Sequence, residues 1–178
     1  MRALVVFATG LFLGAGPSAC ARGPHSADVP PATSAVAPSF EADRAAIIKT
    51  AERFFDGMRT RDTAALRALL DPELVMIAVL DSAGVEVIER MRVPAFLHAV
   101  ATAPEELRER IWSPEVRIAG PVATLWAPYD FHFGESFSHC GHDAFQFVRT
   151  LAGWSITGLS YTIRPVDCPR GSVGHPSG

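Results

Sequence analysis

The feature that most constrains this chain is the stretch 107–164, in which strand-forming segments alternate with short turns that contain glycine. The turns lie at residues 119–120, 134–135 and 151–153. Glycine is favoured there because a tight hairpin requires backbone angles that other residues adopt only with strain. The sequence therefore predicts antiparallel strands over residues 107–118, 122–133, 137–150 and 154–164.

Helical patterns precede this sheet. Apolar residues recur at helical spacing in three segments, residues 41–59, 64–70 and 94–102. Asp62 or Thr63 can cap the second of these helices. A hairpin is predicted between the second and third helices, with strands over residues 73–80 and 85–91. The predicted fold class is therefore α+β, with three helices in the N-terminal half packed on a mostly antiparallel sheet.

The first residues are typical of an export signal. Arg2 precedes an apolar run, residues 3–13, that is too short to span a bilayer as a stable anchor. Residues 1–20 are therefore predicted to form a signal peptide. The protein is expected to be exported to the cell envelope or periplasm, with or without a lipid anchor, or to be secreted.

Two interpretations of the cleavage zone stay open. Ser18-Ala19-Cys20 resembles the end of a lipobox, in which Cys20 would be lipidated, although Pro17 stands where that motif usually has Leu. Ala19-Cys20-Ala21 instead fits the rule of small residues for ordinary secretion. A lipid anchor on Cys20 is the only contact with a membrane that we expect.

One folded domain is expected between two unstructured ends. Residues 21–39 are rich in Pro and Ala and predict an extended linker, and residues 169–178 are rich in Gly, Pro and Ser and predict a disordered tail. A chain of 178 residues then leaves a single domain over residues 40–168. Its composition, 48% hydrophobic and 20% charged, is sufficient for one hydrophobic core.

Charge and motifs argue against several classes of function. The chain has 16 Lys and Arg against 19 Asp and Glu, with no basic run that could neutralise phosphates. Lys49 is the only lysine, and the sequence contains neither a Gly-rich phosphate loop nor a nucleophile elbow. Nucleic acid is therefore not an expected partner, nucleotide-driven chemistry is not expected, and no cofactor is predicted.

Three local motifs accompany the predicted order of elements. They are Ala51-Glu52-Arg53-Phe54-Phe55-Asp56-Gly57, Asp62-Thr63-Ala64-Ala65-Leu66 and Ala152-Gly153-Trp154-Ser155-Ile156. With that order, they resemble the nuclear-transport-factor-two-like superfamily in its SnoaL-like and lumazine-binding-like branch, and residues 138–146 resemble one exported subgroup. The resemblance implies a cone-shaped domain with a curved sheet, whose concave face is covered by helices and holds a pocket. The other face often packs against a second subunit in this superfamily, so a homodimer is expected.

Counting outward from the predicted turns places the candidate site residues on the sheet. The count gives the pairs Asp130–His139, Trp126–Asp143 and Asp143–Tyr161. One face is then expected to carry Trp126, Asp130, His132, His139, Asp143 and Tyr161. A carboxylate beside an imidazole is a plausible acid–base pair, so the candidate catalytic residues are Asp130, His139 and Asp143. The candidate ligand-binding residues are Trp126, Tyr129, His142 and Tyr161.

The face that lines the pocket stays open at this point. Trp154 and Ile156 are typical of the concave side, which would place Asp130 and His139 outside the pocket. A bulge at Pro128, which cannot donate a ladder hydrogen bond, would reverse that phase. For Asp130 and His139, a salt bridge at the surface or at a dimer interface is favoured over catalysis, because such pairs are common on protein surfaces.

The residues around Cys140 favour a disulfide over a metal site. His139 and His142 point to opposite faces of a strand, so they cannot bind one ion together, and no metal site is predicted. In an exported protein, Cys140 and Cys168 are the cysteines that remain after Cys20. We expect a disulfide that fixes the C-terminal segment to the sheet and contributes about 3 kcal/mol.

Three functions remain after this reasoning, and the sequence does not decide whether the protein is an enzyme. The first is an exported small-molecule-binding or accessory domain. The second is a cofactor-free enzyme of the isomerase or dehydratase kind, in which Tyr129 or Tyr161 donates a hydrogen bond to a developing oxyanion. The third is a structural, dimeric interaction module that uses the Trp126 side of the sheet.

Overall fold

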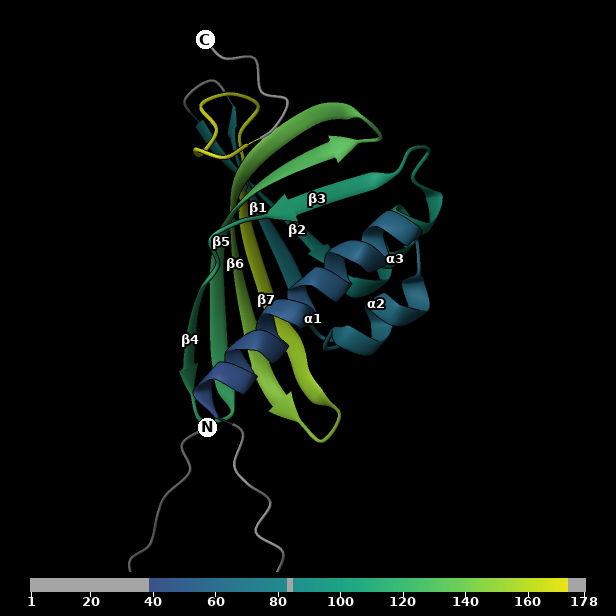
Figure 1. Ribbon diagram of the computed structural model, residues 1–178. Helices are drawn as coiled ribbons and strands as arrows, with labels where there is room; N and C mark the ends of the chain where they lie inside the picture. The colour runs from purple at the N-terminus through teal and green to yellow at the C-terminus, as the bar shows by residue number, and fades with distance from the viewer. Residues whose placement is uncertain (1–38, 83–84, 173–178) are drawn as a thin grey trace, which may run out of the picture. The chain divides into compact units, whose positions relative to one another are not determined.

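The computed structural model describes residues 39–82 and 85–172 (Figure 1). The predicted signal peptide with Cys20, the predicted linker up to residue 38, and residues 173–178 of the predicted tail lie outside the described residues. The statements below concern the described part of the chain.

Three helices and seven strands form an α+β fold. The helices are α1 (Phe40–Thr60), α2 (Thr63–Leu69) and α3 (Val93–Thr102). The strands are β1 (Val75–Ser82), β2 (Val85–Arg92), β3 (Leu107–Ile111), β4 (Glu115–Ala119), β5 (Val122–Phe133), β6 (Ser136–Thr150) and β7 (Gly153–Ile163). They form one sheet in the order β2-β1-β7-β6-β5-β3, and β4 also pairs with β5. The sheet is mixed because β1 runs parallel to β7, while the other pairs are antiparallel.

The helices begin and end where the sequence predicts. The hydroxyl oxygen of Ser39 accepts a hydrogen bond from the backbone N–H of Ala42, and the Asp62 carboxylate accepts one from that of Ala65. Arg61 ends α1 in the left-handed conformation, with a φ of 57°. The caps at Arg61 and Asp62 fix the turn between α1 and α2, which lie together on one face of the sheet (Figure 1).

The core lies between the helices and the sheet. Phe54 of α1 stacks on Phe96 of α3 with 5.4 Å between ring centroids, and it meets Phe145 of β6 edge-on at 5.8 Å. Each fully buried side chain of this size stabilises the fold by roughly 1.5–3 kcal/mol relative to an exposed one. These aromatic contacts hold α1 and α3 over the middle of the sheet.

The single strand predicted over residues 107–118 is wrong. It is divided into β3 and β4 at Trp112-Ser113-Pro114, and both parts pair with β5. Ser113 has a φ of 47°, and Pro114 has no N–H group to donate to a ladder. The break therefore bends this part of the sheet at a point that the strand-forming residues around it do not reveal.

The predicted turn at residues 134–135 is confirmed, but a bulge follows it. Phe133 lies opposite Ser136, as expected, and Gly134 has a φ of 57°. The register then shifts, so that Phe131 lies opposite His139 and Ser138 is an additional residue in β6. Every later residue of β6 therefore lies one position away from its predicted partner on β5.

This shift corrects two of the predicted cross-strand pairs. Asp130 lies opposite Cys140, and Trp126 lies opposite Ala144, so the pairs Asp130–His139 and Trp126–Asp143 are wrong. The face that was expected to carry six candidate residues is divided in two. The helix-covered face carries His139, Asp143 and Tyr161, and the opposite face carries Trp126, Asp130 and His132.

A second bulge, between β6 and β7, brings the third predicted pair, Asp143–Tyr161, into register. Thr150 lies opposite Gly153, not Trp154, but the register shifts again between Gln146 and Phe147. Asp143 therefore lies opposite Tyr161, as predicted.

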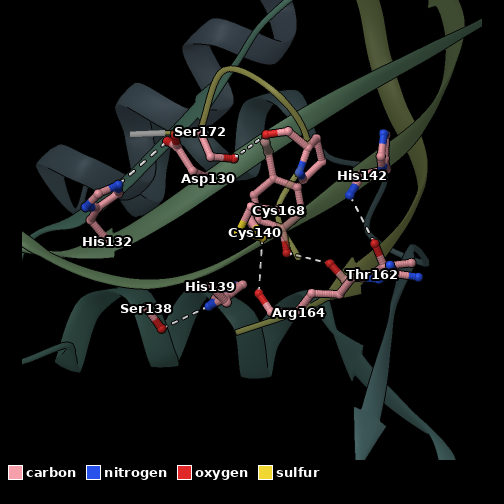
Figure 2. The surroundings of a disulfide bond; sticks show 12 residues. Asp130, His132, Ser138, His139, Cys140, His142, Thr162, Arg164, Cys168 and Ser172 are labelled. Atoms are coloured by element: carbon pink, nitrogen blue, oxygen red, sulfur yellow. Dashed lines mark hydrogen bonds and ion pairs between the residues drawn. A yellow bond between two sulfur atoms is a disulfide. The ribbon is translucent and has the colours of Figure 1, made fainter. Parts of the chain in front are cut away.

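The C-terminal segment is fixed to the outer face of the sheet. Cys140 and Cys168 form the predicted disulfide, with 5.6 Å between their Cα atoms (Figure 2). Cys140 and Arg164 exchange two backbone hydrogen bonds of 2.8 Å. The Arg110 guanidinium donates a hydrogen bond of 2.7 Å to the carbonyl oxygen of Gly171, which belongs to the predicted disordered tail. The folded region therefore continues past Cys168 to at least this residue.

We predict that removal of the disulfide lowers the free energy of unfolding. The bond closes a loop with a sequence separation of 28 residues, for which loop entropy gives roughly 3–4 kcal/mol. The double variant Cys140→Ala and Cys168→Ala should show this loss in urea denaturation. Wild-type protein kept in a thiol reductant is the control and should show a similar loss, and an unchanged midpoint in both would contradict the prediction.

Candidate functional site

A cavity of about 410 Å³ lies between the helices and the concave face of the sheet. Most of its wall is apolar or aromatic, and includes Phe54, Phe96, Val100, Leu107, Phe131 and Leu159. Five polar residues also line it, namely Glu109, Tyr129, His139, Asp143 and Tyr161. An apolar cavity of this size with a few convergent polar groups has the usual character of a small-molecule site.

Two carboxyl groups meet on the wall of this cavity. Asp143 on β6 lies opposite Ala127 of β5, and Glu109 on β3 lies opposite Phe131 of β5. Although Ala127 and Phe131 lie four positions apart on β5, the carboxyl groups of Asp143 and Glu109 are within hydrogen-bonding reach of one another. Asp143 is 2% exposed.

The carboxyl pair of Glu109 and Asp143 holds a proton at neutral pH. Burial raises the pKa of Asp143 to about 7, and the hydrogen bond with Glu109 lowers it in part. Burial and the negative charge of Asp143 raise the pKa of Glu109 well above its ordinary value. Two carboxylates in contact in an apolar setting cannot both ionise freely, so they share a proton.

One oxygen of the pair has no other partner. Oδ2 of Asp143 is buried and receives no hydrogen bond from an N–H or hydroxyl group of the described residues. Leaving a buried polar atom in this state costs roughly 1–3 kcal/mol. The proton shared with Glu109 supplies only one donor for the oxygens of the two carboxyl groups, so acceptors that can take a further hydrogen bond lie at the polar end of the cavity.

The two tyrosines beside the pair differ in their hydrogen bonds. The Tyr129 hydroxyl donates to the carbonyl oxygen of Thr162 at 2.8 Å, and burial raises its pKa far above the ordinary value. Burial raises the pKa of Tyr161 to about 12. Within the described residues the Tyr161 hydroxyl has no hydrogen-bond partner. Tyr161 is therefore the neutral donor that is available to a ligand.

His139 lies in the cavity wall as a neutral ring. It stacks on Phe131 with 4.9 Å between ring centroids, and its Nδ1 lies 2.9 Å from the hydroxyl of Ser138. Burial lowers its pKa to about 4. At neutral pH the His139 ring therefore adds no positive charge to the cavity.

Asp130 is separated from His139 by the sheet. On the outer face its carboxylate accepts hydrogen bonds from Arg110 at 2.6 and 3.3 Å. His132 lies 3.7 Å from the same carboxylate (Figure 2). The predicted Asp130–His139 acid–base pair is therefore wrong because the bulge places its members on opposite faces. Asp130 instead takes part in an ion pair near the C-terminal segment.

Two of the predicted ligand-binding residues also lie outside the cavity. Trp126 and His142 stack on one another on the outer face, with 5.2 Å between ring centroids, and Trp126 is 48% exposed. Tyr129 and Tyr161, the other two, line the cavity. Among the described residues, no group of three or more His, Cys, Asp or Glu side chains is arranged to hold a metal ion.

Glu109 was not identified from the sequence. The strand predicted over residues 107–118 carries no predicted pairing with its neighbours, and the break at residues 112–114 divides it. The signal was present in the alternation of Leu107, Glu109 and Ile111, in which a carboxylate stands among residues that face the core.

A larger cleft of about 750 Å³ lies beside this cavity, along α1, β3 and β5. Its charged groups largely pair with one another, in the ion pairs Arg59–Asp56, Arg108–Glu135 and Arg110–Asp130. Glu109 borders both the cleft and the cavity. Because these charged groups largely compensate one another, we take the apolar cavity as the candidate site.

No protein-family model and no curated protein matches the chain. Among solved structures it is similar to an NTF2-like protein of unknown function from Shewanella baltica OS155, with 14% identity and a TM-score of 0.54 over 72% of this chain and 98% of that one. It is also similar to a proposed dehydratase of the NTF2-like family from Streptomyces avermitilis, with 13% identity and a TM-score of 0.53 over 73% and 100%. A third similar structure is the beta subunit of a proposed aromatic-ring-hydroxylating dioxygenase from Novosphingobium aromaticivorans, with 11% identity and a TM-score of 0.59 over 71% and 92%.

The chain has the NTF2-like fold. This is the nuclear-transport-factor-two-like fold that the sequence motifs predicted, with three helices on a mixed, mostly antiparallel sheet. At these identities the NTF2-like fold does not define an activity, since folds of this kind carry unrelated functions. Among the described residues, none of the helices is both long and apolar enough to cross a membrane.

We predict that Asp143→Asn changes how stability depends on pH. Unfolded Asp143 ionises near pH 3.8 and the folded residue near pH 7, so between these values the folded protein binds more protons. The free energy of unfolding should therefore fall as pH rises through this range, by at most about 1.4 kcal/mol per pH unit from this group. The variant should lose that part of the slope in urea titrations, whereas the exposed control Glu115→Gln should keep it. Equal slopes in all three proteins would contradict the assignment.

Gly141 is predicted to be intolerant of a side chain. A Cβ atom there would lie 1.9 Å from the carbonyl oxygen of Thr162, the oxygen that accepts the Tyr129 hydrogen bond. Gly141→Ala should lower the free energy of unfolding by about 2 kcal/mol or more, because the two backbones must move apart. Tyr129→Phe removes only the hydrogen bond and should cost about 1 kcal/mol. Thermal unfolding of both variants measures the difference, and a fully stable Gly141→Ala protein would refute the packing.

Proposed function

We propose that this domain binds a small, mainly apolar molecule in its cavity, with the polar end of the molecule at Glu109 and Asp143. The observation that carries the proposal is the buried Oδ2 atom of Asp143, which receives no hydrogen bond from an N–H or hydroxyl donor of the described residues, on a mostly apolar wall. A protein that gains nothing from such an atom is stabilised by an apolar residue in its place. A ligand that donates a hydrogen bond to this oxygen accounts for its presence.

A second candidate function is cofactor-free proton transfer. A carboxyl group with a pKa near 7 can accept or donate a proton at neutral pH, and burial gives Asp143 this property. The Tyr161 hydroxyl is then a donor for an oxyanion that forms on the substrate. These groups replace the Asp130–His139 pair as the acid–base centre of an isomerase or dehydratase. The similar structure from Streptomyces avermitilis, a proposed dehydratase, agrees in fold with this candidate.

The cellular setting remains a proposal as well. We infer that the domain acts outside the cytoplasm, and the Cys140–Cys168 disulfide supports this because such bonds persist in oxidising compartments. A homodimer through the outer face would cover Trp126, which is 48% exposed. An interaction module that uses this face is compatible with ligand binding because the cavity lies on the other side of the sheet.

The test is whether a neutral apolar probe occupies the cavity. Ala99 of α3 lines the cavity and is exposed, so Ala99→Trp should obstruct it, whereas Ala95→Trp places the same side chain on α3 away from the cavity. The probe 4-phenylbutan-1-ol should bind saturably to the wild type and to Ala95→Trp in calorimetric titrations. Ala99→Trp should weaken binding about tenfold or more, as loss of a buried aromatic contact does.

Two outcomes would contradict the proposed function. The first is the absence of saturable binding to the wild type. The second is equal binding by Ala99→Trp and Ala95→Trp, because the probe would then bind elsewhere.

A further inference from the structure

We propose that the ligand carries a positively charged amino group that binds between the carboxyl groups of Glu109 and Asp143, with its apolar body against the aromatic wall. This inference rests on the proposed function, because it assumes that the cavity is occupied by a small molecule. It adds the chemical class of that molecule, a hydrophobic amine in its ammonium form.

The charges around the cavity select against an anion. Besides Glu109 of β3 and Asp143 of β6, the titratable groups that line the cavity are His139 from β6, Tyr129 from β5 and Tyr161 from β7. Helices α1 and α3 contribute only apolar residues, such as Met58 and Val100. No lysine or arginine of the described residues lines this cavity. Its field is therefore negative, and an anionic ligand would bind without a compensating charge.

The charges beyond the wall do not reverse this field. Asp130 lies behind the sheet and adds a negative potential at Glu109, and Glu89 of β2 acts in the same direction on Tyr161. Glu109 also borders the neighbouring cleft, which is lined by Arg59, Arg108 and Arg110. These guanidinium groups form ion pairs with Asp56, Glu135 and Asp130, respectively. The positive charge that would neutralise the pair is therefore absent from the described side chains of the cavity.

The hydrogen-bond inventory also favours an ammonium group. The pair offers up to four carboxyl oxygens but holds only one shared proton, and Oδ2 of Asp143 receives no hydrogen bond from an N–H or hydroxyl donor of the described residues. The Tyr129 hydroxyl is already used on Thr162. An ammonium group supplies three N–H donors and a unit charge, so it satisfies both deficits at once. A neutral alcohol supplies one donor and leaves the charge of the pair unchanged.

The aromatic residues near these acceptors suit an organic cation better than a metal ion. Phe131, Tyr129 and Tyr161 line the cavity beside the pair, and aromatic faces attract cations. A metal ion needs more oxygen or nitrogen ligands than two carboxylates supply. The described residues contain no group of three or more such ligands.

Binding of an ammonium ion should release the shared proton. The cation replaces that proton between the two carboxylates, and the proton leaves to solvent, so charge and atoms balance. Since burial raises the pKa of Asp143 to about 7, the proton competes with the amine below that pH. Amine affinity is therefore expected to rise as pH rises from 6 to 7.5.

The experiment compares three probes of one shape, 4-phenylbutylamine, 4-phenylbutan-1-ol and 4-phenylbutanoate, by calorimetric titration of the protein at pH 7.5. We expect the amine to bind about tenfold more tightly than the alcohol, and the carboxylate to bind most weakly, because a charged hydrogen bond in an apolar site is stronger than a neutral one. Titrations of the amine at pH 6.5 in buffers of different ionisation enthalpy should show proton release, which the alcohol should not.

Variants of Glu109 and Asp143 test whether these two residues cause the preference for the amine over the alcohol. Glu109→Gln and Asp143→Asn should each weaken amine binding about tenfold and leave alcohol binding within about threefold. Glu115→Gln changes an exposed carboxylate on β4 and should alter neither. Far-ultraviolet circular dichroism identifies a variant that fails to fold. In that case the comparison of the three probes on the wild type tests the ammonium proposal by itself.

The failure of this inference differs from the failure of the proposed function. If the alcohol binds and Ala99→Trp blocks it, but the amine binds no more tightly, the ammonium proposal is overturned and ligand binding stands. If the carboxylate binds more tightly than the amine, the ammonium proposal is also overturned. If the alcohol fails to bind saturably, the proposed function is contradicted before the comparison begins.

Discussion

The additional residue in β6 is the constraint on which the candidate site depends. Ser138 is unmatched in the ladder between β5 and β6, so the side chains of β6 beyond it exchange faces relative to a regular pairing. As a result, His139 and Asp143 lie under the helices, and Cys140 lies on the outer face. A shift of one residue in register thus decides which groups line the cavity. It also places Cys140 on the outer face, where it forms the disulfide with Cys168 of the C-terminal segment.

Both faces of the sheet carry buried carboxyl groups, but among the described residues only the carboxylate on the outer face is paired with a cation. On the outer face, the buried carboxylate of Asp130 is compensated by Arg110, whose guanidinium also holds Gly171. On the inner face, Asp143 and Glu109 have no cation and share a proton instead. Burial without a counter-charge favours the protonated form of a carboxyl group, and this is what makes the inner pair responsive to pH and to a cationic ligand.

Strands β6 and β7 approach closely beside the carboxyl pair. Gly141 lets β6 approach β7 closely, and the Tyr129 hydroxyl completes this junction by binding the carbonyl oxygen of Thr162. That bond removes Tyr129 as a donor for a ligand and leaves Tyr161 in that role. The same junction is next to Cys140, so the disulfide and the cavity wall are parts of one packed region of the sheet.

The sequence by itself determined the order of the helices and strands apart from the break between β3 and β4, the α+β class, the turn at residues 134–135 and the disulfide, because these follow from local patterns and from the small number of cysteines. It also named Asp143 and Tyr161 as neighbours. Only the tertiary structure decided that Glu109, and not Asp130, is the partner of Asp143. The physical reason is that a strand alternates its side chains with period two, so a single bulge or break reverses every assignment beyond it. Bulges form where the whole sheet must bend, which no local pattern encodes.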